Sequence, residues 1–249
     1  MLSQNEQLRY SRQIMLNKIG ENGQLALREA KVLIVGMGGL GNPVSLYLAA
    51  AGVGTLFIAD GDNVDITNLQ RQILFTEKDV GNNKADIGAE KLQQHNSEIV
   101  IEVVDEMLDA ELANYYIEQV DVVIDCTDNI ETRYLLNRIC VEKKTPLIVG
   151  AATGFDGQQL VVDPRNPESA CYQCLFPASE KAPTNNCQTV GIVGPVLAIV
   201  AGMQSLQAIK LLTGNAVQIN QLNMFDGLSN QWQQFSLKKQ DDCPACSDC

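Results

Sequence analysis

One stretch near the N-terminus constrains the fold more than any other part of the sequence. An apolar run rich in β-branched residues, Lys31–Gly36, leads into a glycine-rich turn, Gly36–Gly41 (GMGGLG). An Ala- and Leu-rich segment with helical character, Pro43–Ala51, follows, and Thr55–Asp60 is the next apolar run. Strand, glycine turn, helix and strand in this order predict a βαβ unit with a right-handed crossover.

The alternation of strands and helices continues to about residue 150. The predicted strands are Ile99–Val104, Asp121–Asp125 and Pro146–Val149, and the predicted helices are Asn83–Gln94, Asp109–Glu118 and Ile130–Lys143. Such alternation predicts an α/β fold with a doubly wound, mostly parallel sheet of the Rossmann type. Two helices, Gln4–Lys18 and Gln24–Glu29, are expected to precede it.

The pattern changes after Gly150. Short strands are expected at Gln158–Asp163, Leu222–Asp226 and Trp232–Leu237, with a long helix at Val193–Leu212 and a Pro-rich loop at Asp163–Asn186. We expect these strands to form an antiparallel C-terminal extension. No linker-like stretch interrupts the chain, so we expect one domain over 1–249. Its parts are an N-terminal helical arm (1–30), the half with alternating strands and helices (31–150) and the half that follows the change of pattern (151–249).

Composition narrows the classes of function. The net charge of −12 disfavours non-specific nucleic-acid binding, which needs clustered Lys and Arg. The polar N-terminus lacks the apolar segment of a secretory signal. The apolar stretch Val190–Met203 is too short to span a bilayer and is expected to form a buried helix. We therefore expect a cytoplasmic protein without a membrane partner. A disulfide framework is not expected, and some of the eight cysteines are expected to serve metal binding or catalysis.

The glycine turn predicts a nucleotide site. Gly36, Gly38 and Gly41 give G-x-G-x-x-G, which lets phosphates approach the backbone at a helix N-terminus. Asp60 ends the next strand, where a carboxylate can accept ribose hydroxyls. These features alone favour a nicotinamide dehydrogenase. Arg71 and Lys84 favour a triphosphate instead, because both offer charge to phosphate oxygens, although each taken singly is more often a solvated surface charge.

Asp128 follows the predicted strand Asp121–Asp125 in the sequence DCTDN. Ligands collect at the carboxyl ends of strands in open α/β sheets. A carboxylate there can hold Mg²⁺ together with phosphate oxygens. The competing interpretation is that Asp128 caps the helix that follows, and the two roles are compatible.

Several motifs occur together in a fixed order. They are RYSRQI (Arg9–Ile14), GMGGLG, NLQRQ (Asn68–Gln72), Lys84, DCTDN (Asp125–Asn129), two C-x-x-C pairs and NNCQTVGIVGP (Asn185–Pro195). With this set the chain resembles the ThiF/MoeB/HesA family, the bacterial relatives of ubiquitin-activating enzymes, over nearly its whole length. The resemblance implies a homodimeric adenylyltransferase. Such an enzyme uses ATP to activate the C-terminal Gly-Gly carboxylate of a ubiquitin-like sulfur carrier protein and releases pyrophosphate. The resemblance implies that 31–150 is the nucleotide-binding half and that 151–249 is the carrier-binding half with a zinc site.

The resemblance also implies roles for individual residues. Arg12 would reach the active site of the other subunit, and Asp128 would support Mg²⁺. Arg71 and Lys84 would contact phosphates and, with Arg12, Asp128 and Cys187, make up the catalytic set. The implied ATP-binding residues are Gly36, Gly38, Gly39, Gly41, Asp60, Asp62, Asn68, Arg71, Gln72, Lys84, Asp128 and Asn129.

The cysteines divide into three groups. Cys171, Cys174, Cys243 and Cys246 form two C-x-x-C pairs, which match a closed, structural Cys₄ zinc site; a single pair could instead be redox-active. The resemblance places at Cys187 the cysteine that links to the carrier, and the alternative is a loop cysteine without a catalytic task. Cys126 and Cys140 are expected in the core, and Cys249 has no expected role. His95, the lone histidine, is expected at the surface.

Two carriers compete as the substrate. The sequences CYQCLFP (Cys171–Pro177) and FDGLSNQW (Phe225–Trp232) look more like the thiamine-pathway member, which acts on a ThiS-type carrier. The alternative is the molybdopterin-pathway member, which acts on a MoaD-type carrier. A cysteine desulfurase or sulfurtransferase is a further expected partner. A nicotinamide-dependent oxidoreductase and a non-enzymatic zinc module remain as more distant alternatives.

Overall fold

The computed structural model describes residues 1–178 and 191–247. Within these residues, eight strands form one sheet in the order β3-β2-β1-β4-β5-β6-β7-β8. The strands are β1 (Lys31–Val35), β2 (Thr55–Ala59), β3 (Val100–Val104), β4 (Val122–Asp125), β5 (Leu147–Thr153), β6 (Asp156–Val162), β7 (Gln221–Asp226) and β8 (Gln231–Ser236). Strands β1 to β5 pair in parallel, and β5 to β8 pair antiparallel. The predicted doubly wound sheet and its antiparallel extension are confirmed.

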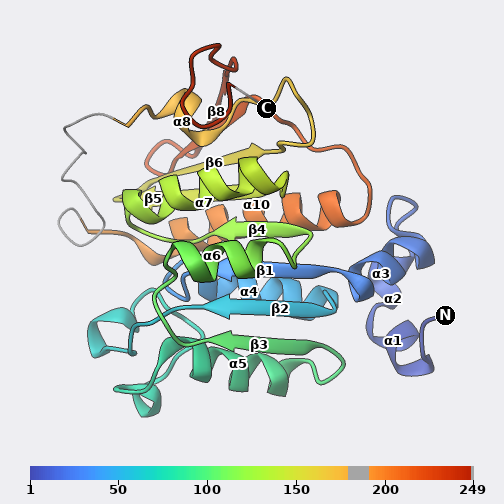
Figure 1. Cartoon of the computed structure of the whole chain (residues 1–249). Coiled ribbons are helices and arrows are strands. Elements are labelled where there is room, and N and C mark those ends of the chain that lie inside the picture. Colours follow the sequence, from blue (N-terminus) through green and yellow to red (C-terminus); the bar gives the residue numbers. More distant parts are fainter. Residues whose placement is uncertain (179–190, 248–249) are drawn as a thin grey trace.

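The helices cover both faces of this sheet. They are α1 (Gln4–Arg9), α2 (Ser11–Ile14), α3 (Gly20–Glu29), α4 (Gly41–Ala51), α5 (Lys84–His95), α6 (Ala110–Ile117), α7 (Ile130–Lys143), α8 (Tyr172–Leu175) and α10 (Gly194–Leu212). Figure 1 shows α6 and α7 on one face of the sheet and α4 and α10 on the other. One sheet thus carries both the nucleotide-binding half and the C-terminal half, although the division of the chain into three parts stays a prediction.

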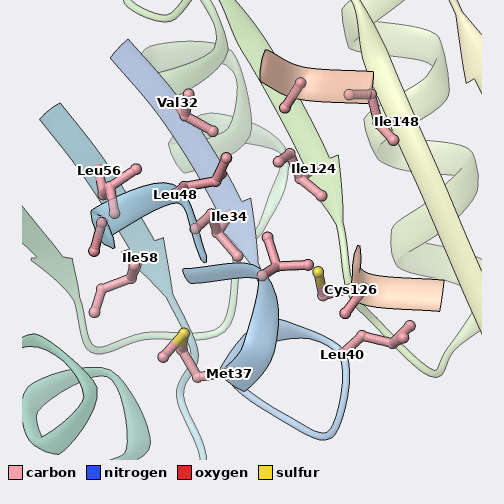
Figure 2. Close-up of a cluster of buried hydrophobic side chains, with 14 of the residues drawn as sticks. Val32, Ile34, Met37, Leu40, Leu48, Leu56, Ile58, Ile124, Cys126 and Ile148 are labelled. Carbon is pink, nitrogen blue, oxygen red and sulfur yellow. The ribbon is translucent and has the colours of Figure 1, made fainter. Parts of the chain in front are cut away.

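The core follows from strands that are apolar on both sides, as parallel strands between two layers of helices must be. Val32 and Ile34 of β1 point to the face of α4 and α10, and Leu33 and Val35 point to the face of α6 and α7. Figure 2 shows the first cluster, where Leu48 of α4 lies over the β1 side chains beside neighbours from β2, β4 and β5. The predicted core cysteines Cys126 and Cys140 are buried.

Helix α10 is the one described helix that is long and apolar enough, by length and composition, to cross a membrane. It is longer than the apolar stretch noted in the sequence, but it packs on β5, β6 and α4. Its buried Gln204 donates through Nε2 to the carbonyl oxygens of Asp125 at 2.8 Å and Ile148 at 3.4 Å. A polar bridge to two central strands is typical of a core helix, and this agrees with the predicted buried helix.

The expected single helix over Gln4–Lys18 is wrong. The chain forms α1 and α2 with a break at Tyr10, where φ is −98° and ψ is 10°. The Tyr10 side chain is buried against Gly52, and its hydroxyl accepts a hydrogen bond from Asn96 Nδ2 at 2.9 Å. Anchoring this side chain in the domain divides the expected helix into two short helices.

Other boundaries differ in smaller ways. The predicted loop Asp163–Asn186 contains the single turn α8 at the first C-x-x-C pair, because Tyr172 is buried there. Strand β5 extends to Thr153 because it pairs antiparallel with β6 along its whole length. The other predicted strands and helices agree with the structure to within a few residues.

Candidate active site

The glycine turn lies at the carboxyl end of β1 and opens α4. Gly36 has a φ of +94°, a conformation that favours glycine, and a Cβ there would lie 2.9 Å from the carbonyl oxygen of Cys126. At Gly41 a Cβ would overlap the carbonyl oxygen of Gly36. No side chain caps the first turn of α4. Asn42 and Val44 donate their N–H groups to the carbonyl oxygens of Gly38 and Leu40, and Pro43 has no N–H. An anion would therefore be met by the N–H of Gly41 and by those of the glycine turn before it.

Asp60 follows β2 and holds the glycine turn. Its carboxylate accepts the N–H groups of Met37 at 2.7 Å and Asp62 at 2.8 Å. Burial raises the pKa of this carboxyl, and the nearby Lys84 ammonium and the two N–H donors oppose that rise only in part. Each carboxylate oxygen can accept a second hydrogen bond, so Asp60 can still receive a ribose hydroxyl.

Lys84 begins α5 and brings a cation to the same edge of the sheet. Its Nζ lies 2.8 Å from Oδ2 of Asp62. The ion pair is asymmetric, because the Lys84 side chain is 8% exposed whereas that of Asp62 is 65% exposed. A phosphate oxygen can therefore replace the carboxylate of Asp62 on Lys84 while Asp62 turns to solvent.

The segment Asn68–Gln72 begins at the last residue of the 3₁₀ helix η1 (Ile66–Asn68). The side chain of Asn68 accepts the Asp65 N–H at 3.1 Å and so caps the start of that helix. The Arg71 guanidinium donates to the carbonyl oxygen of Thr67 at 3.0 Å. Arg71 is half-buried and makes only this one hydrogen bond among the described residues. Most of its N–H donors are therefore available to an anion.

Gln72 carries a more specific signal. Its side chain is 3% exposed, and its Oε1 has no hydrogen-bond partner among the described residues. The Nε2 atom lies 3.8 Å from the place of a Cβ on Gly38, so the amide faces the glycine turn. A buried acceptor without a partner costs about 1–3 kcal/mol. This cost is removed when a ligand or a water donates to Gln72 at that place.

The loop after β4 reaches the glycine turn from the other side, since the Cys126 carbonyl lies beside Gly36. Asp125 is fully buried and accepts both the N–H (2.9 Å) and the hydroxyl (2.6 Å) of Thr127. Burial raises the pKa of Asp125, and Arg133, whose Nε lies 3.4 Å away, opposes this rise in part. The Cys126 pKa is also raised by burial, as expected for a packing residue rather than a nucleophile.

Asp128 does not cap α7, so one of its two predicted roles is wrong. Asn129 is the N-cap, and its side chain accepts the Thr132 N–H at 2.8 Å. The cap falls at Asn129 because this residue has the extended backbone that the position requires. Asp128 is exposed and has no hydrogen-bond or ion-pair partner in the described part of the chain. Its carboxylate is therefore available to a cation.

The structure thus gathers most of the expected nucleotide residues at the carboxyl ends of the neighbouring strands β2, β1 and β4. It does not bring Arg12 there. Arg12 is exposed on α2, where its NH1 lies 4.0 Å from the sulfur of Met15. Figure 1 shows α1, α2 and α3 beside the amino ends of the strands. Cys187 and Cys249 lie outside the described residues, and His95 is exposed as expected.

Two important residues escaped the sequence analysis. Arg133 donates to the carbonyl oxygens of Thr127 at 2.6 Å and Gly150 at 3.0 Å, so it fixes the loop that carries Asp128. Gln204 of α10 reaches the end of β4, as described above. The only sequence signal for Gln204 was a polar residue within an apolar helix. The only signal for Arg133 was its position in the first helical turn after DCTDN.

The four paired cysteines form one cluster. Their sulfur atoms all lie within 4.8 Å of one another. Cys171 and Cys243 are 3.6 Å apart, and Cys174 and Cys246 are 3.4 Å apart. Two N–H donors serve the sulfur atoms: Asn137 Nδ2 at 3.5 Å from Cys171 and the backbone of Gln240 at 3.4 Å from Cys174. Four converging sulfurs with supporting donors fit a tetrahedral Zn²⁺ ion.

These features define an α/β nucleotide-binding protein with a separate cluster of four cysteines. Residues 10–245 match the model of the ThiF family, and the chain belongs to that family. It is 46% identical over 239 residues to the sulfur carrier protein ThiS adenylyltransferase of Escherichia coli. This alignment covers 96% of this chain and 94% of that protein.

Two further relatives extend the comparison. The adenylyltransferase and sulfurtransferase MOCS3 of Culex quinquefasciatus is 45% identical over 99% of this chain, which spans 57% of the length of that protein. Among solved structures, Escherichia coli MccB with MccA-N7isoASN has a TM-score of 0.84 at 25% identity and covers 96% of this chain and 74% of that one. The expected membership of the ThiF family and the expected fold are confirmed.

Proposed function

We propose that the protein is an adenylyltransferase that uses ATP to activate the C-terminal Gly-Gly carboxylate of a ubiquitin-like sulfur carrier of the ThiS type. The observation that carries this proposal is the set of polar groups around the glycine turn: Gln72 faces Gly38, and Lys84 pairs with Asp62 beside the carboxylate that holds the turn. Asp128 follows the loop whose Cys126 carbonyl lies beside Gly36, and Arg71 lies in the same segment as Gln72. A nicotinamide dehydrogenase has no use for two cations and a free carboxylate at this place. The 46% identity to a ThiS adenylyltransferase supports the choice of reaction and carrier.

In the proposed reaction a carrier carboxylate oxygen attacks the α-phosphorus of ATP. The bond from that phosphorus to the bridging oxygen breaks, pyrophosphate leaves with the electron pair, and an acyl-adenylate remains. Asp60 would bind the ribose, and Arg71 and Lys84 would balance the charge that grows on the phosphate oxygens. Asp128 would hold Mg²⁺ together with those oxygens, and a bound Mg²⁺ supplies charge neutralisation.

Zn²⁺ would be held by the four clustered cysteines in a closed site. Such a site clamps the C-terminal tail to the segment around α8 and contributes to folding rather than to chemistry. Its fit rests on the sulfur positions and on the Asn137 and Gln240 donors.

We also infer a homodimer in which Arg12 serves the site of the other subunit. Within one chain Arg12 lies beside the amino ends of the strands, away from Lys84. The packed helices α4 and α10 expose large apolar side chains at Tyr47 (58%), Ile199 (37%) and Leu206 (56%). An apolar surface of this kind is typical of an interface, and a second copy would cover it while delivering Arg12.

The remaining expectations depend on the carrier. MOCS3 relatives keep a MoaD-type carrier as the alternative substrate. Cys187 would link to the carrier C-terminus, with a cysteine desulfurase or sulfurtransferase as the sulfur source. We place this reaction in the cytoplasm.

The test is ATP–pyrophosphate exchange with purified ThiS-type and MoaD-type carriers in parallel. We expect exchange with the ThiS-type carrier and its loss in Arg71→Ala and Lys84→Ala. Lys78→Ala is the matched control, because Lys78 is exposed on the neighbouring 3₁₀ helix η2 (Glu77–Asp79) and should keep full activity. Exchange with neither carrier would contradict the proposed function.

A mixing experiment tests the dimer. Arg12→Ala and Lys84→Ala are each expected to be inactive alone. When the two variants are mixed and allowed to exchange subunits, one site of each mixed dimer regains both residues, and part of the activity returns. No recovery after demonstrated subunit exchange would show that Arg12 does not act across the interface.

A further inference from the structure

Helix α7 runs between the nucleotide loop and the cysteine cluster. Its 14 residues span about 21 Å. Its N-terminus follows directly on Asp128 and is capped by Asn129. Arg133 and Asn137 are four residues apart and therefore lie on the same face of the helix. Both are buried, and neither has a role in the chemistry proposed above.

The contacts of Arg133 lie at the end of α7 that is next to the Asp128 loop. Its acceptor Thr127 and its ion-pair partner Asp125 lie at the carboxyl end of β4. Its second acceptor, Gly150, follows the last residue of β5 that pairs with β4. The contacts to Thr127 and Asp125 fix the backbone immediately before Asp128. A change in the position of Arg133 therefore moves the carboxylate proposed to serve Mg²⁺ and ATP.

The side-chain contacts of Asn137 are with residues of the cysteine cluster and its neighbour. Its Oδ1 accepts the N–H of Tyr172 at 2.8 Å, and its Nδ2 donates to the sulfur of Cys171 at 3.5 Å. One amide thus holds both the first cysteine of the cluster and the residue after it. Because α8 has only 4 residues, it is too short to keep its shape without tertiary contacts. A metal that joins its cysteines to Cys243 and Cys246 would provide such contacts.

Tyr172 connects the two ends. Its side chain is 3% exposed, and its ring packs on Phe176 and Tyr134 with centroids 4.9 and 5.9 Å away. Burial raises the pKa of its hydroxyl, while the Arg133 charge and a side-chain hydrogen bond with Arg133 lower it in part. Asn137 thus holds Cys171 and Tyr172 to α7. The hydrogen bond between the side chains of Tyr172 and Arg133 leads from there to the loop that carries Asp128.

We propose that α7 couples the occupancy of the cysteine cluster to the affinity for ATP, with Arg133, Asn137 and Tyr172 as positioning residues. Metal binding fixes Tyr172, Tyr172 fixes Arg133, and Arg133 fixes the Asp125–Asp128 loop in the form that binds nucleotide. By linkage, ATP must tighten metal binding by the same factor. The inference rests on the proposed function only in taking ATP as the ligand of the loop.

The test uses the full-length protein loaded with zinc and Tyr172→Phe as the variant. This change keeps the ring, all four cysteines and Asn137, and removes the hydroxyl that meets Arg133. We expect Tyr172→Phe to retain the zinc content of the unaltered protein and to bind ATP–Mg²⁺ at least about fivefold more weakly by titration calorimetry, the lower end of typical coupling. Tyr134→Phe is the matched control, because its hydroxyl donates to the carbonyl oxygens of Phe176 and Pro177.

The reciprocal measurement is zinc affinity by competition with a chelator, with and without saturating ATP–Mg²⁺. We expect ATP to raise the zinc affinity of the unaltered protein and of Tyr134→Phe by at least about fivefold, and to leave that of Tyr172→Phe unchanged. A purely structural role for Tyr172 would lower stability without removing this dependence. Equal ATP affinity in Tyr172→Phe, or a zinc affinity indifferent to ATP, would overturn the coupling alone. No ATP binding by the unaltered protein would overturn the proposed function as well.

Discussion

Two alanine substitutions in the glycine turn separate its structural role from its ligand-binding role. At Gly41 a Cβ would overlap the Gly36 carbonyl oxygen, which belongs to the backbone and cannot turn aside. At Gly38 the nearest atom to a Cβ is Gln72 Nε2 at 3.8 Å, an ordinary contact, and its φ is not in the left-handed region. Gly41→Ala therefore strains the folded chain, whereas Gly38→Ala does not.

The magnitudes follow from these contacts. Overpacking costs about 1–3 kcal/mol, and a backbone clash belongs at the upper end, so Gly41→Ala loses about 3 kcal/mol. At about 2–4 °C per kcal/mol for a chain of this size, its Tm falls by roughly 6–12 °C. Gly38→Ala keeps its Tm or gains slightly, because alanine has less conformational freedom than glycine in the unfolded chain.

The ligand responds in the opposite way at Gly38. A methyl group there holds a phosphate away from the loop N–H groups, and a hydrogen bond to a charged group contributes about 1.5–3 kcal/mol. We expect ATP–Mg²⁺ to bind Gly38→Ala about one to two orders of magnitude more weakly. Thermal unfolding by circular dichroism and titration calorimetry measure the two effects. Normal ATP binding by Gly38→Ala would refute the phosphate position, and a normal Tm for Gly41→Ala would refute the packing argument.

Three further perturbations test other parts of the molecule. Elemental analysis should find about one zinc per chain, and prolonged chelation should lower the Tm; protein purified without chelators that contains none would contradict the Cys₄ site. Asn129→Ala removes the cap of α7 and should lower the free energy of unfolding by about 1 kcal/mol, measured by urea unfolding. An unchanged urea midpoint would show that the cap does not stabilise the protein. The Ser3 N–H lowers the pKa of Glu6 below its ordinary 4.5, so the stability that the Glu6 carboxylate contributes is complete above pH 4.5 and disappears as pH falls through the folded pKa. The stability difference between Glu6→Gln and the unaltered protein should shrink in that range, and a constant difference would argue against this linkage.

The fold was largely readable because its signals are local. Strands such as Lys31–Val35 are short, β-branched and bounded by glycine or charge, and the helices between them carry clear ends. The break at Tyr10 was not readable, because it depends on Asn96 and Gly52, which approach only in the folded chain. The turn α8 was missed for a similar reason, since buried contacts hold it.

The residues of the candidate site also divide into those that a local sequence signal predicts and those that depend on distant partners. The glycine turn, Asp60 and the paired cysteines are recognisable because spacing in sequence determines their geometry. Arg133 and Gln204 act through backbone carbonyls of distant strands, and no short motif records such partners. Asn129 rather than Asp128 caps α7, and the sequence DCTDN does not distinguish these two neighbouring cap residues.

Charge balance links three partners of the proposed function: Mg²⁺, the second subunit and ATP itself. The proposed nucleotide site contains the carboxylates Asp60, Asp62 and Asp128 and the cations Arg71 and Lys84. These groups together carry one net negative charge. Asp125 and Arg133 cancel each other as a buried pair. A triphosphate added to this edge would meet net repulsion within one chain. The proposed Mg²⁺ at Asp128 and the Arg12 of a second subunit each reverse part of that balance, so we expect ATP affinity to fall steeply when either one is removed.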